Sequence, residues 1–189
     1  AFGFGIAVVM VVAAVFADVI TVHSPIDIEF ESMLVSPNLD YLLGTDQLGR
    51  DIFARIVYGA RTALLVGITA SVIGAFIGLV LGVASAYFGG TFDLLFQRVM
   101  DVFMAFPLII LALAIVSIFG GGIDKVIIAI TVPFIPRCAR VVRSNALAIR
   151  EIPYVDAARA MGFSHSRIIL RHMVPNVMAP FLIMITAFV

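Results

Sequence analysis

The chain contains a stretch, residues 62–92, in which no side chain is charged; Arg61 and Asp93 bound it. Its apolar core, residues 62–88, exceeds the roughly 20 residues that an α-helix needs to cross about 30 Å of hydrocarbon. The chain as a whole is also strongly apolar, with 62% hydrophobic residues, 13% charged residues and a mean hydropathy of +1.17. A soluble domain of 189 residues cannot bury that much apolar surface, so we expect an all-α, polytopic transmembrane helical bundle.

Five membrane segments are predicted. They are residues 2–22, 62–88, 102–119, about 123–142, and a segment that begins near Met173. Both ends of the chain fall in apolar runs, and we therefore expect a fragment of a longer membrane protein that is truncated in its first and last helices. The first segment lacks a basic region and a clear cleavage site, so we interpret it as a transmembrane helix and not a signal peptide.

The fourth segment is the most polar of the five. Only eleven residues separate Lys125 from Arg137, so Arg137 and Arg140 must snorkel or face the interior of the bundle. Pro133 and Pro136 predict a broken or kinked helix that its neighbours support.

The charges predict the orientation of the chain in the membrane. From Asp18 to Arg61 there are seven acids and three arginines, whereas from Arg137 to Arg171 there are seven arginines and two acids. Because Lys and Arg are in excess on the cytoplasmic side, residues 23–61 are expected outside and residues 143–172 in the cytosol. Three spans separate the two regions, which agrees with opposite sides, and the N-terminus is then cytoplasmic.

Small residues recur on one face of the second segment at Gly74, Gly78 and Gly82, a spacing that lets two helices approach closely. We favour packing within one subunit over a dedicated dimer seam. Cys138 is the single cysteine and is expected to be a small packing residue. His23, Glu29 and Glu31 match no standard metal-ligand spacing, so a solvated acidic loop is preferred to a metal site.

The outer segment, residues 23–61, is predicted to end in an amphipathic interfacial helix. Asp46 is a plausible N-cap, and the apolar residues from Ile52 to Val57 share a face that leads into the second span. Two interpretations stay open: a helix that only lies at the interface, or a surface that receives a partner or lines an outer gate.

The basic segment at residues 143–175 carries helix punctuation. Pro153 suits the first turn of a helix and Gly162 the position after its end, which predicts a short helix over about residues 153–161. Val155, Ala158 and Met161 share a face that is expected to enter a groove of another protein. Ser164 is expected to cap a second helix, which contains Ile168, Ile169 and Met173, and Pro175 to mark the entrance of the last span.

This segment resembles the loop by which permease subunits of bacterial ATP-driven (ABC) importers dock onto their ATPase. The family pattern is Glu-Ala-Ala, three residues, Gly, nine residues, then Ile-x-Leu-Pro. The chain matches it at Ala157, Ala158, Gly162 and Pro175. It departs from the pattern at three positions, Asp156 for Glu, His172 for Ile and Val174 for Leu; a His here followed by Pro-Asn is similar to the peptide-transport branch.

Three other strings extend the resemblance over about residues 40–180. They are Ala105-Phe106-Pro107, Tyr87-Phe88-Gly89-Gly90, and the outer motif that contains Gly44, Thr45, Asp46, Gly49, Arg50 and Asp51. Together they resemble the second permease subunit of dipeptide, oligopeptide or nickel ABC importers, of the type I permease fold.

The resemblance implies a translocation subunit and not an enzyme. The only lysine, Lys125, follows Asp124, so no phosphate-binding loop is present, and no catalytic, cofactor-binding or metal motif was found. The resemblance implies that ATP is hydrolysed by two separate ATPase subunits and that this chain pairs with a second permease. It also implies an extracytoplasmic binding protein and a bacterial or archaeal plasma membrane. No nucleic-acid partner is expected.

Several alternatives remain. A generic basic loop explains the arginines of residues 143–172 but not the spacing of Pro153, Gly162 and Pro175. An ABC permease for another solute is the nearest alternative function. An ion-coupled secondary transporter is disfavoured because Asp18 and Asp101 lie near the ends of spans, and a structural membrane protein has no reason to carry the docking loop. The solute and the residues that line its pathway are not assigned from the sequence.

Overall fold

The computed structural model describes residues 2–188, and over this range the chain forms helices and loops without a β-strand. This confirms the predicted all-α class. The chain divides into two compact units, residues 1–66 and residues 67–189, and α3 (Ile52–Phe88) contributes to both.

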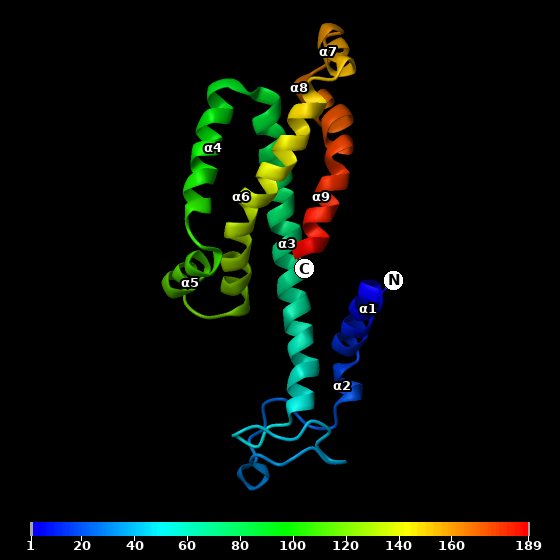
Figure 1. Cartoon of the computed structure of the whole chain (residues 1–189), viewed down its shortest axis with the longest axis vertical. Helices are drawn as coiled ribbons and strands as arrows, with labels where there is room; N and C mark the ends of the chain where they lie inside the picture. Colours follow the sequence, from blue (N-terminus) through cyan, green and yellow to red (C-terminus); the bar gives the residue numbers. More distant parts are fainter. Residues whose placement is uncertain (1, 189) are drawn as a thin grey trace. The chain divides into compact units, whose positions relative to one another are not determined.

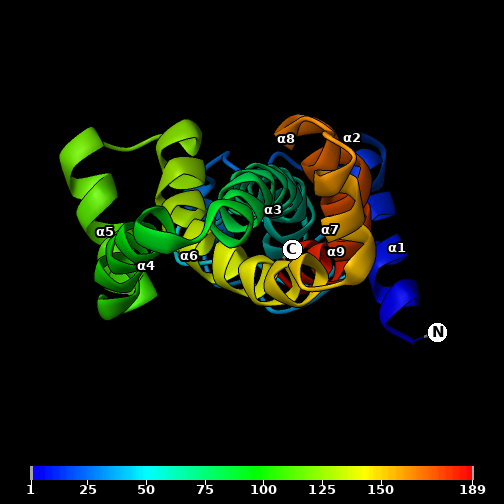
Figure 2. The ribbon, with the colours of Figure 1, turned by 90° about the horizontal axis from the view of Figure 1, so that it is seen from above.

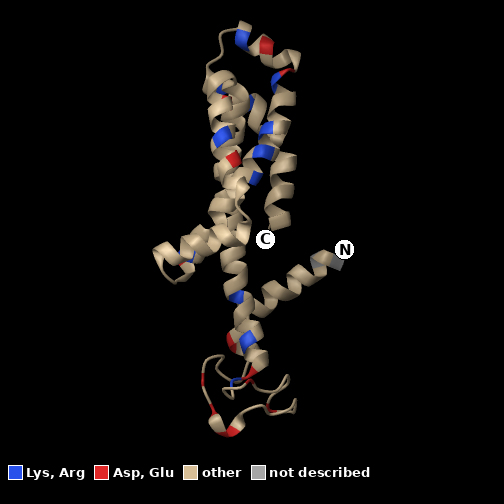
Figure 3. Ribbon diagram, turned by 60° about the vertical axis from the view of Figure 1, so that its left-hand side comes forward, with Lys and Arg blue, Asp and Glu red and all other residues tan. Residues whose placement is uncertain are grey.

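The first unit holds α1 (Phe2–Val15), α2 (Ala17–Ile20), the short 3₁₀ helix η1 (Phe30–Ser32) and the start of α3 (Figure 1). The predicted first span is therefore two helices. The Asp18 carboxylate of α2 accepts a hydrogen bond of 2.7 Å from the Tyr58 hydroxyl and pairs with Arg61 at 3.4 Å, which joins α2 to α3. The irregular residues between α2 and α3 carry most of the acidic side chains of this unit (Figure 3).

The predicted helix from Ile52 that leads into the second span is present, but the prediction that Asp46 is its N-cap is wrong. The helix begins at Ile52 and continues to Phe88 as one element. The Asp46 carboxylate accepts hydrogen bonds from the backbone N–H groups of Leu48 and Arg50 and closes a turn ahead of the helix. Asp51 has the capping role instead, because its Oδ1 accepts a 2.8 Å hydrogen bond from the Phe53 N–H.

The second unit is a bundle around one long helix, α6. Figures 1 and 2 show α6 between α4 and α5 on one side and α3 and α9 on the other. Besides α3, the elements of this unit are α4 (Gly90–Ala105), α5 (Leu108–Phe119), α6 (Ile123–Arg150), α7 (Pro153–Ala160), α8 (His165–Ile168), the π-helical turn η2 (Ile169–Met173) and α9 (Val174–Phe188).

The glycine face of α3 packs directly against α6. A Cβ atom on Gly74 would lie 2.6 Å from Phe134 Cδ1, and one on Gly82 would lie 2.6 Å from the Ala139 carbonyl oxygen. Gly78 is equally close to Cys138, and both Phe134 and Cys138 are fully buried. The packing of this face within the subunit, which the spacing predicts, is thus confirmed.

The third predicted span, residues 102–119, is wrong as a single helix. The chain forms α4 and α5, whose axes are bent by 89° at the break between Ala105 and Leu108. Pro107 explains the break, because the α conformation is disfavoured for a residue that precedes proline, and Phe106 is extended with φ −88° and ψ 135°. In α6, by contrast, Pro133 and Pro136 lie inside one helix of 28 residues.

The last span begins earlier than Met173. Residues His165–Phe188 form a continuous helical run of 24 residues, so Pro175 lies within it and not at its entrance. Proline has no N–H and collides with the carbonyl four residues earlier. The π turn Ile169–Met173 precedes it, and the Val174 N–H bonds to the Ile169 carbonyl five residues back.

Two helical runs, α3 and His165–Phe188, are long and apolar enough to cross a membrane. The bent pair α4–α5 makes a third if it is one broken span, and Gly5–Val15 is a shorter apolar helix. Helix α6, with 28 residues, is long enough to cross a membrane, but it carries four arginines and is not one of these apolar runs. The chain is a multi-pass membrane protein.

Candidate functional site

The candidate site is the polar connection between α6 and α9, which we call the elbow segment (residues 153–168). Its first helix, α7, begins with Pro153 in the first turn and ends at Ala160, as predicted. Gly162 then has φ +76°, a left-handed conformation that glycine adopts without strain. The Gly162 N–H bonds to the Arg159 carbonyl and the Phe163 N–H to the Ala158 carbonyl, which is the Schellman pattern of a helix end.

The second helix of the elbow starts where the sequence predicts. Ser164 is the N-cap of α8, and its side chain accepts a hydrogen bond from the Arg167 N–H. The Arg167 guanidinium also lies over the Phe163 ring, 4.1 Å from its centroid, which holds the chain on both sides of the cap. The turn at Gly162 is therefore fixed by backbone hydrogen bonds and by its flanking side chains.

The elbow segment is anchored to the bundle by apolar side chains. Val155 and Ala158 of α7 and Ile168 of α8 are all buried, in the same cluster as Ile149 and Met173. The prediction that Val155, Ala158 and Met161 enter a groove of another protein is thus wrong for the first two, because this chain already covers them. Met161 is 65% exposed, and the side of α7 left free carries Asp156, Ala157 and Ala160.

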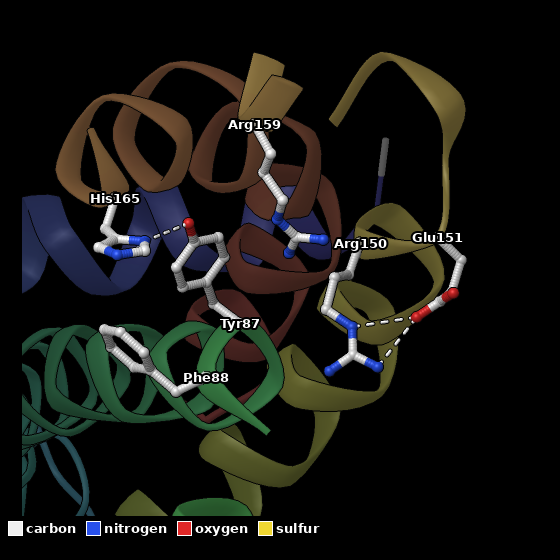
Figure 4. Close-up of a pocket in the computed structure, with 6 residues that line it drawn as sticks. All are labelled: Tyr87, Phe88, Arg150, Glu151, Arg159 and His165. Atoms are coloured by element: carbon white, nitrogen blue, oxygen red, sulfur yellow. Dashed lines mark hydrogen bonds and ion pairs between the residues drawn. The ribbon is translucent and has the colours of Figure 1, made fainter. Parts of the chain in front are cut away.

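Aromatic and basic side chains connect the elbow to the end of α3 (Figure 4). The Tyr87 hydroxyl lies 2.7 Å from His165 Nδ1, and the Arg159 guanidinium lies over the Tyr87 ring, 5.2 Å from its centroid. Arg150 donates a 2.8 Å hydrogen bond to the Ala86 carbonyl and pairs with Glu151 at 2.9 Å. An open cavity of about 400 Å³ is lined by Tyr87, Phe88, Arg150, Glu151, Arg159 and His165.

A second set of contacts connects α7 to the start of the last span. The Tyr154 hydroxyl donates to the His172 carbonyl at 3.3 Å, and the Asn176 amide donates to the same carbonyl at 2.7 Å and to the Tyr154 hydroxyl at 3.1 Å. His172 is half-buried beside the Tyr154 and Phe163 rings, whereas Pro175 is exposed. Of the predicted loop residues, Ala158 and His172 therefore pack inside the chain, and Asp156, Ala157, Gly162 and Pro175 are exposed.

The outer motif forms a separate structure in the first unit. Gly44 and Gly49 have φ of +75° and +73°, and a Cβ on Gly49 would lie 1.9 Å from the Glu29 carbonyl oxygen. The Thr45 hydroxyl accepts a 2.8 Å hydrogen bond from the Val35 N–H. Asp51 is buried and lies 3.3 Å from His23 Nδ1. These motif residues hold the irregular segment in its own fold.

Asp46 is the electrostatic centre of this turn. It pairs with Arg50 at 2.8 Å and with Arg55. Loss of hydration raises the pKa of the Asp46 carboxyl group, but hydrogen bonds from the Arg50 guanidinium and from the Leu48 and Arg50 N–H groups outweigh this effect. The net result is a pKa held well below its usual range.

Residues 74–188, which include the end of α3, the other helices of the second unit and the whole elbow segment, match the family model described as "Binding-protein-dependent transport system inner membrane component". The chain belongs to this family. Among curated members, it is 45% identical over 184 residues to a "Putative peptide transport system permease protein" of Brucella suis. It is 41% identical over 177 residues to the dipeptide transport system permease protein DppC of Alkalihalophilus pseudofirmus. It is 39% identical over 183 residues to the glutathione transport system permease protein GsiD of Escherichia coli.

These alignments cover 97%, 93% and 95% of this chain but only 62%, 58% and 59% of the three relatives, respectively. The chain thus spans less than two thirds of the length of these permeases. Family membership confirms the resemblance to ABC importer permeases of the peptide branch. Within the family region, sequence reasoning missed the roles of His165, Arg150 and Tyr154. Tyr87 was singled out only as part of a family string, and its contact with His165 depends on packing between distant segments.

Proposed function

We propose that this chain is a translocation subunit of an ATP-driven peptide importer, and that the elbow segment transmits the movement of a separate ATPase to the bundle. The single observation that carries this proposal is the anchoring of the elbow. Its inner side, Val155 and Ala158, is buried in the core, while Asp156 and Ala157 remain free on the outer side of the same short helix. A force applied to the free side therefore reaches the core directly.

The elbow has rigid connections to three parts of the bundle. Tyr87 connects it to α3 through His165, Ile149 connects it to the end of α6 through the buried cluster, and Tyr154 connects it to the start of the last span through His172 and Asn176. ATP binding by a partner changes the relative populations of two bundle states only if the partner binds the two states differently. A helix that is fixed to several spans moves with them, and its exposed side presents a different position to the partner in each state. The partner can therefore bind the two states differently.

The proposed assembly follows from the family and from the names of the relatives, which specify peptide, dipeptide and glutathione transport. It consists of this chain, a second permease, two ATPase subunits and an extracytoplasmic binding protein. The elbow segment faces the cytosol and residues 23–61 face outward, because the arginines gather around the elbow and the acids in the outer segment. The assembly resides in the plasma membrane, and an importer of nickel or another small solute is the second candidate.

The test is affinity purification of the full-length chain from its native membrane, followed by mass spectrometry. We expect an ATPase and a second permease to copurify with it. Replacement Ala157→Trp places a large ring on the free side of α7 and is expected to remove the ATPase while the second permease stays. Ala114→Trp, on an exposed position of α5, is the matched control. A complex that lacks an ATPase, or that keeps it after Ala157→Trp, contradicts the proposed docking.

The solute class is tested separately, by ATP-dependent uptake of labelled di- and tripeptides into vesicles that contain the whole assembly. Uptake of peptides that requires both ATP and the binding protein supports the peptide importer. Uptake of a nickel complex or another small solute in their place supports the second candidate.

A further inference from the structure

One side of α6 carries polar side chains that remain exposed to a large extent. Arg137, Arg140 and Ser144 are exposed and lie on one helical face at spacings of three, four and seven residues. The opposite face carries Phe134, Cys138 and Val142, which are fully buried against α3 and the core. We call the exposed set the α6 strip.

The strip begins at the middle of α6. Arg137 is the fifteenth of the 28 residues of α6, so about 20 Å of helix extends on either side of it at 1.5 Å per residue. The predicted span ends near residue 142, so Arg137 lies in its cytosolic half, where an arginine either snorkels to the membrane surface or faces water and other polar groups, because exposure to hydrocarbon is costly. The position of Arg137 at a cavity of this chain favours the second arrangement.

The strip has an excess of positive charge. Arg140 pairs with Asp101 of α4 at 2.5 Å, whereas no ion pair involves Arg137 within residues 2–188. Asp93, the other acid of α4, forms an ion pair with Arg143, which also lies on α6. One of the two guanidinium groups of the strip is therefore left without a balancing carboxylate among the described residues.

Arg137 also lies at the broken part of the bundle. Together with Phe106 and Leu108 it lines a small cavity at the break between α4 and α5. Non-helical backbone at membrane depth is tolerated where it is buried in protein or lines a water-filled space. In membrane transporters, interrupted helices frequently border the solute site. The exposed strip and the interrupted helix thus meet at one residue.

The exposed face of α3 is chemically different. Phe76 and Val80 are 60% and 52% exposed, and both are apolar, as expected of a surface in contact with lipid or with an apolar partner helix. The α6 strip suits neither neighbour. Its composition fits a surface that lines water.

We propose that the α6 strip lines the solute pathway and that Arg137, assisted by Arg140, forms a binding subsite for a carboxylate group of the transported solute. This proposal rests on the proposed import function and adds a solute chemistry to it. Guanidinium groups bind carboxylates through paired hydrogen bonds, and the C-terminus of a peptide is such a carboxylate.

The first experiment measures water access and charge without any solute. In full-length complexes with Cys138→Ala, a thiol is placed on the strip by Ser144→Cys and treated with two methanethiosulfonate reagents, the anionic ethylsulfonate and the cationic ethyltrimethylammonium. Ser144 lies at the cytosolic end of the strip, so both reagents are expected to react, and the informative quantity is the preference for the anionic one relative to their rates with a free thiol. Arg137→Gln combined with Arg140→Gln should reduce this preference about tenfold.

The control is Phe76→Cys, on the apolar face of α3, which is expected to react with neither reagent. If Ser144→Cys is equally unreactive, the strip does not line water and the proposal fails. If it reacts but the preference is unchanged by the arginine replacements, the strip is not an anion subsite and the proposal fails.

The second experiment measures solute recognition in the assembled importer. Arg137→Gln is expected to reduce uptake of a peptide with a free C-terminus about tenfold, and Arg137→Lys to restore part of it, because lysine keeps the charge but not the paired hydrogen bonds. Arg98→Gln, which removes an exposed arginine of α4, is the matched control and should leave uptake unchanged. Equal losses with Gln and Lys at position 137 contradict the subsite. A wild-type assembly that imports no peptide would instead refute the proposed function, and the labelling result would still stand.

Discussion

At the residue scale, Gly162 is the position where a single backbone conformation sets the shape of the elbow. Its φ is +76°, and an added Cβ would meet nothing within 4 Å. A substitution there is therefore unfavourable because of backbone strain alone, and the effect is not confused with a steric clash. A β-branched residue suffers most from this conformation, whereas asparagine tolerates it.

We predict that Gly162→Val, with a strain of about 1–3 kcal/mol, displaces α7 and uncouples ATP hydrolysis from solute uptake while the complex stays in the membrane. Gly162→Asn is the control and should retain most of the coupling. The measurement is the amount of solute imported per ATP hydrolysed in reconstituted vesicles. Normal coupling in Gly162→Val would show that the elbow does not depend on this turn.

Asp46 has the corresponding role in the outer segment, with charge in place of backbone conformation. Its pKa lies below the usual value of 3.8, so the folded turn favours the ionised form. The resulting stabilisation is complete above about pH 4 and is lost only as the pH falls further toward the folded-state pKa. The turn should therefore be insensitive to pH over the whole physiological range.

The prediction is that hydrogen exchange of the Leu48 and Arg50 amides, corrected for intrinsic rates, is the same at pH 7 and pH 5. Asp46→Asn removes the charge and should accelerate exchange at both pH values. Asp40→Asn, an exposed acid of the same segment, should have no effect. Loosening of the wild-type turn between pH 7 and pH 5 would mean that another group controls it.

At the scale of elements, the glycines of α3 bring its backbone close to that of α6. Gly82 faces backbone atoms of α6, the Ala139 carbonyl oxygen and the Arg143 nitrogen, which have no rotamer to adopt in response to a larger side chain. A methyl group at this position requires the two helices to separate. Small residues at a helix interface in the membrane permit this kind of close approach.

We predict that Gly82→Ala lowers the stability of the detergent-solubilised complex by about 1–3 kcal/mol. Gly59→Ala lies on the same helix where an added Cβ meets nothing within 4 Å, and it should be neutral or slightly stabilising. Thermal unfolding of the two variants, followed side by side, checks the difference. If both variants unfold alike, the contact between α3 and α6 is less tightly packed than the distances imply.

The elements also differ in how well the sequence predicts them. The turn at Gly162, the cap at Ser164 and the glycine face of α3 follow from local rules and were found correctly. The break at Phe106 was missed because hydropathy is uniform across it, although Pro107 carried the signal. The π turn at Ile169–Met173 was missed because it depends on how the continuous helix accommodates Pro175.

At the scale of the whole molecule, burial reversed one prediction about the candidate site. The helical face with Val155 and Ala158 was assigned to a partner because it is apolar, but a sequence alone does not distinguish an apolar face that meets a partner from one that meets its own core. The structure places this face inward and leaves Asp156 and Ala157 free. The contacts of Tyr87 and Tyr154 join segments far apart in the chain, and no local pattern predicts them.

The Tyr87–His165 contact connects α3, the longest helix of the chain, to the elbow and offers a test of how movement passes between them. Tyr87→Phe keeps the ring beneath Arg159 and removes only the hydroxyl that lies 2.7 Å from His165 Nδ1. We predict that solute imported per ATP falls severalfold in Tyr87→Phe while ATP hydrolysis continues. The bundle should stay folded, because a single such hydrogen bond contributes about 1 kcal/mol. His165→Ala should produce the same loss, and the double variant should be no worse than either single one, since both remove one interaction. Additive losses would mean that Tyr87 and His165 act through different contacts and that the connection between α3 and the elbow lies elsewhere.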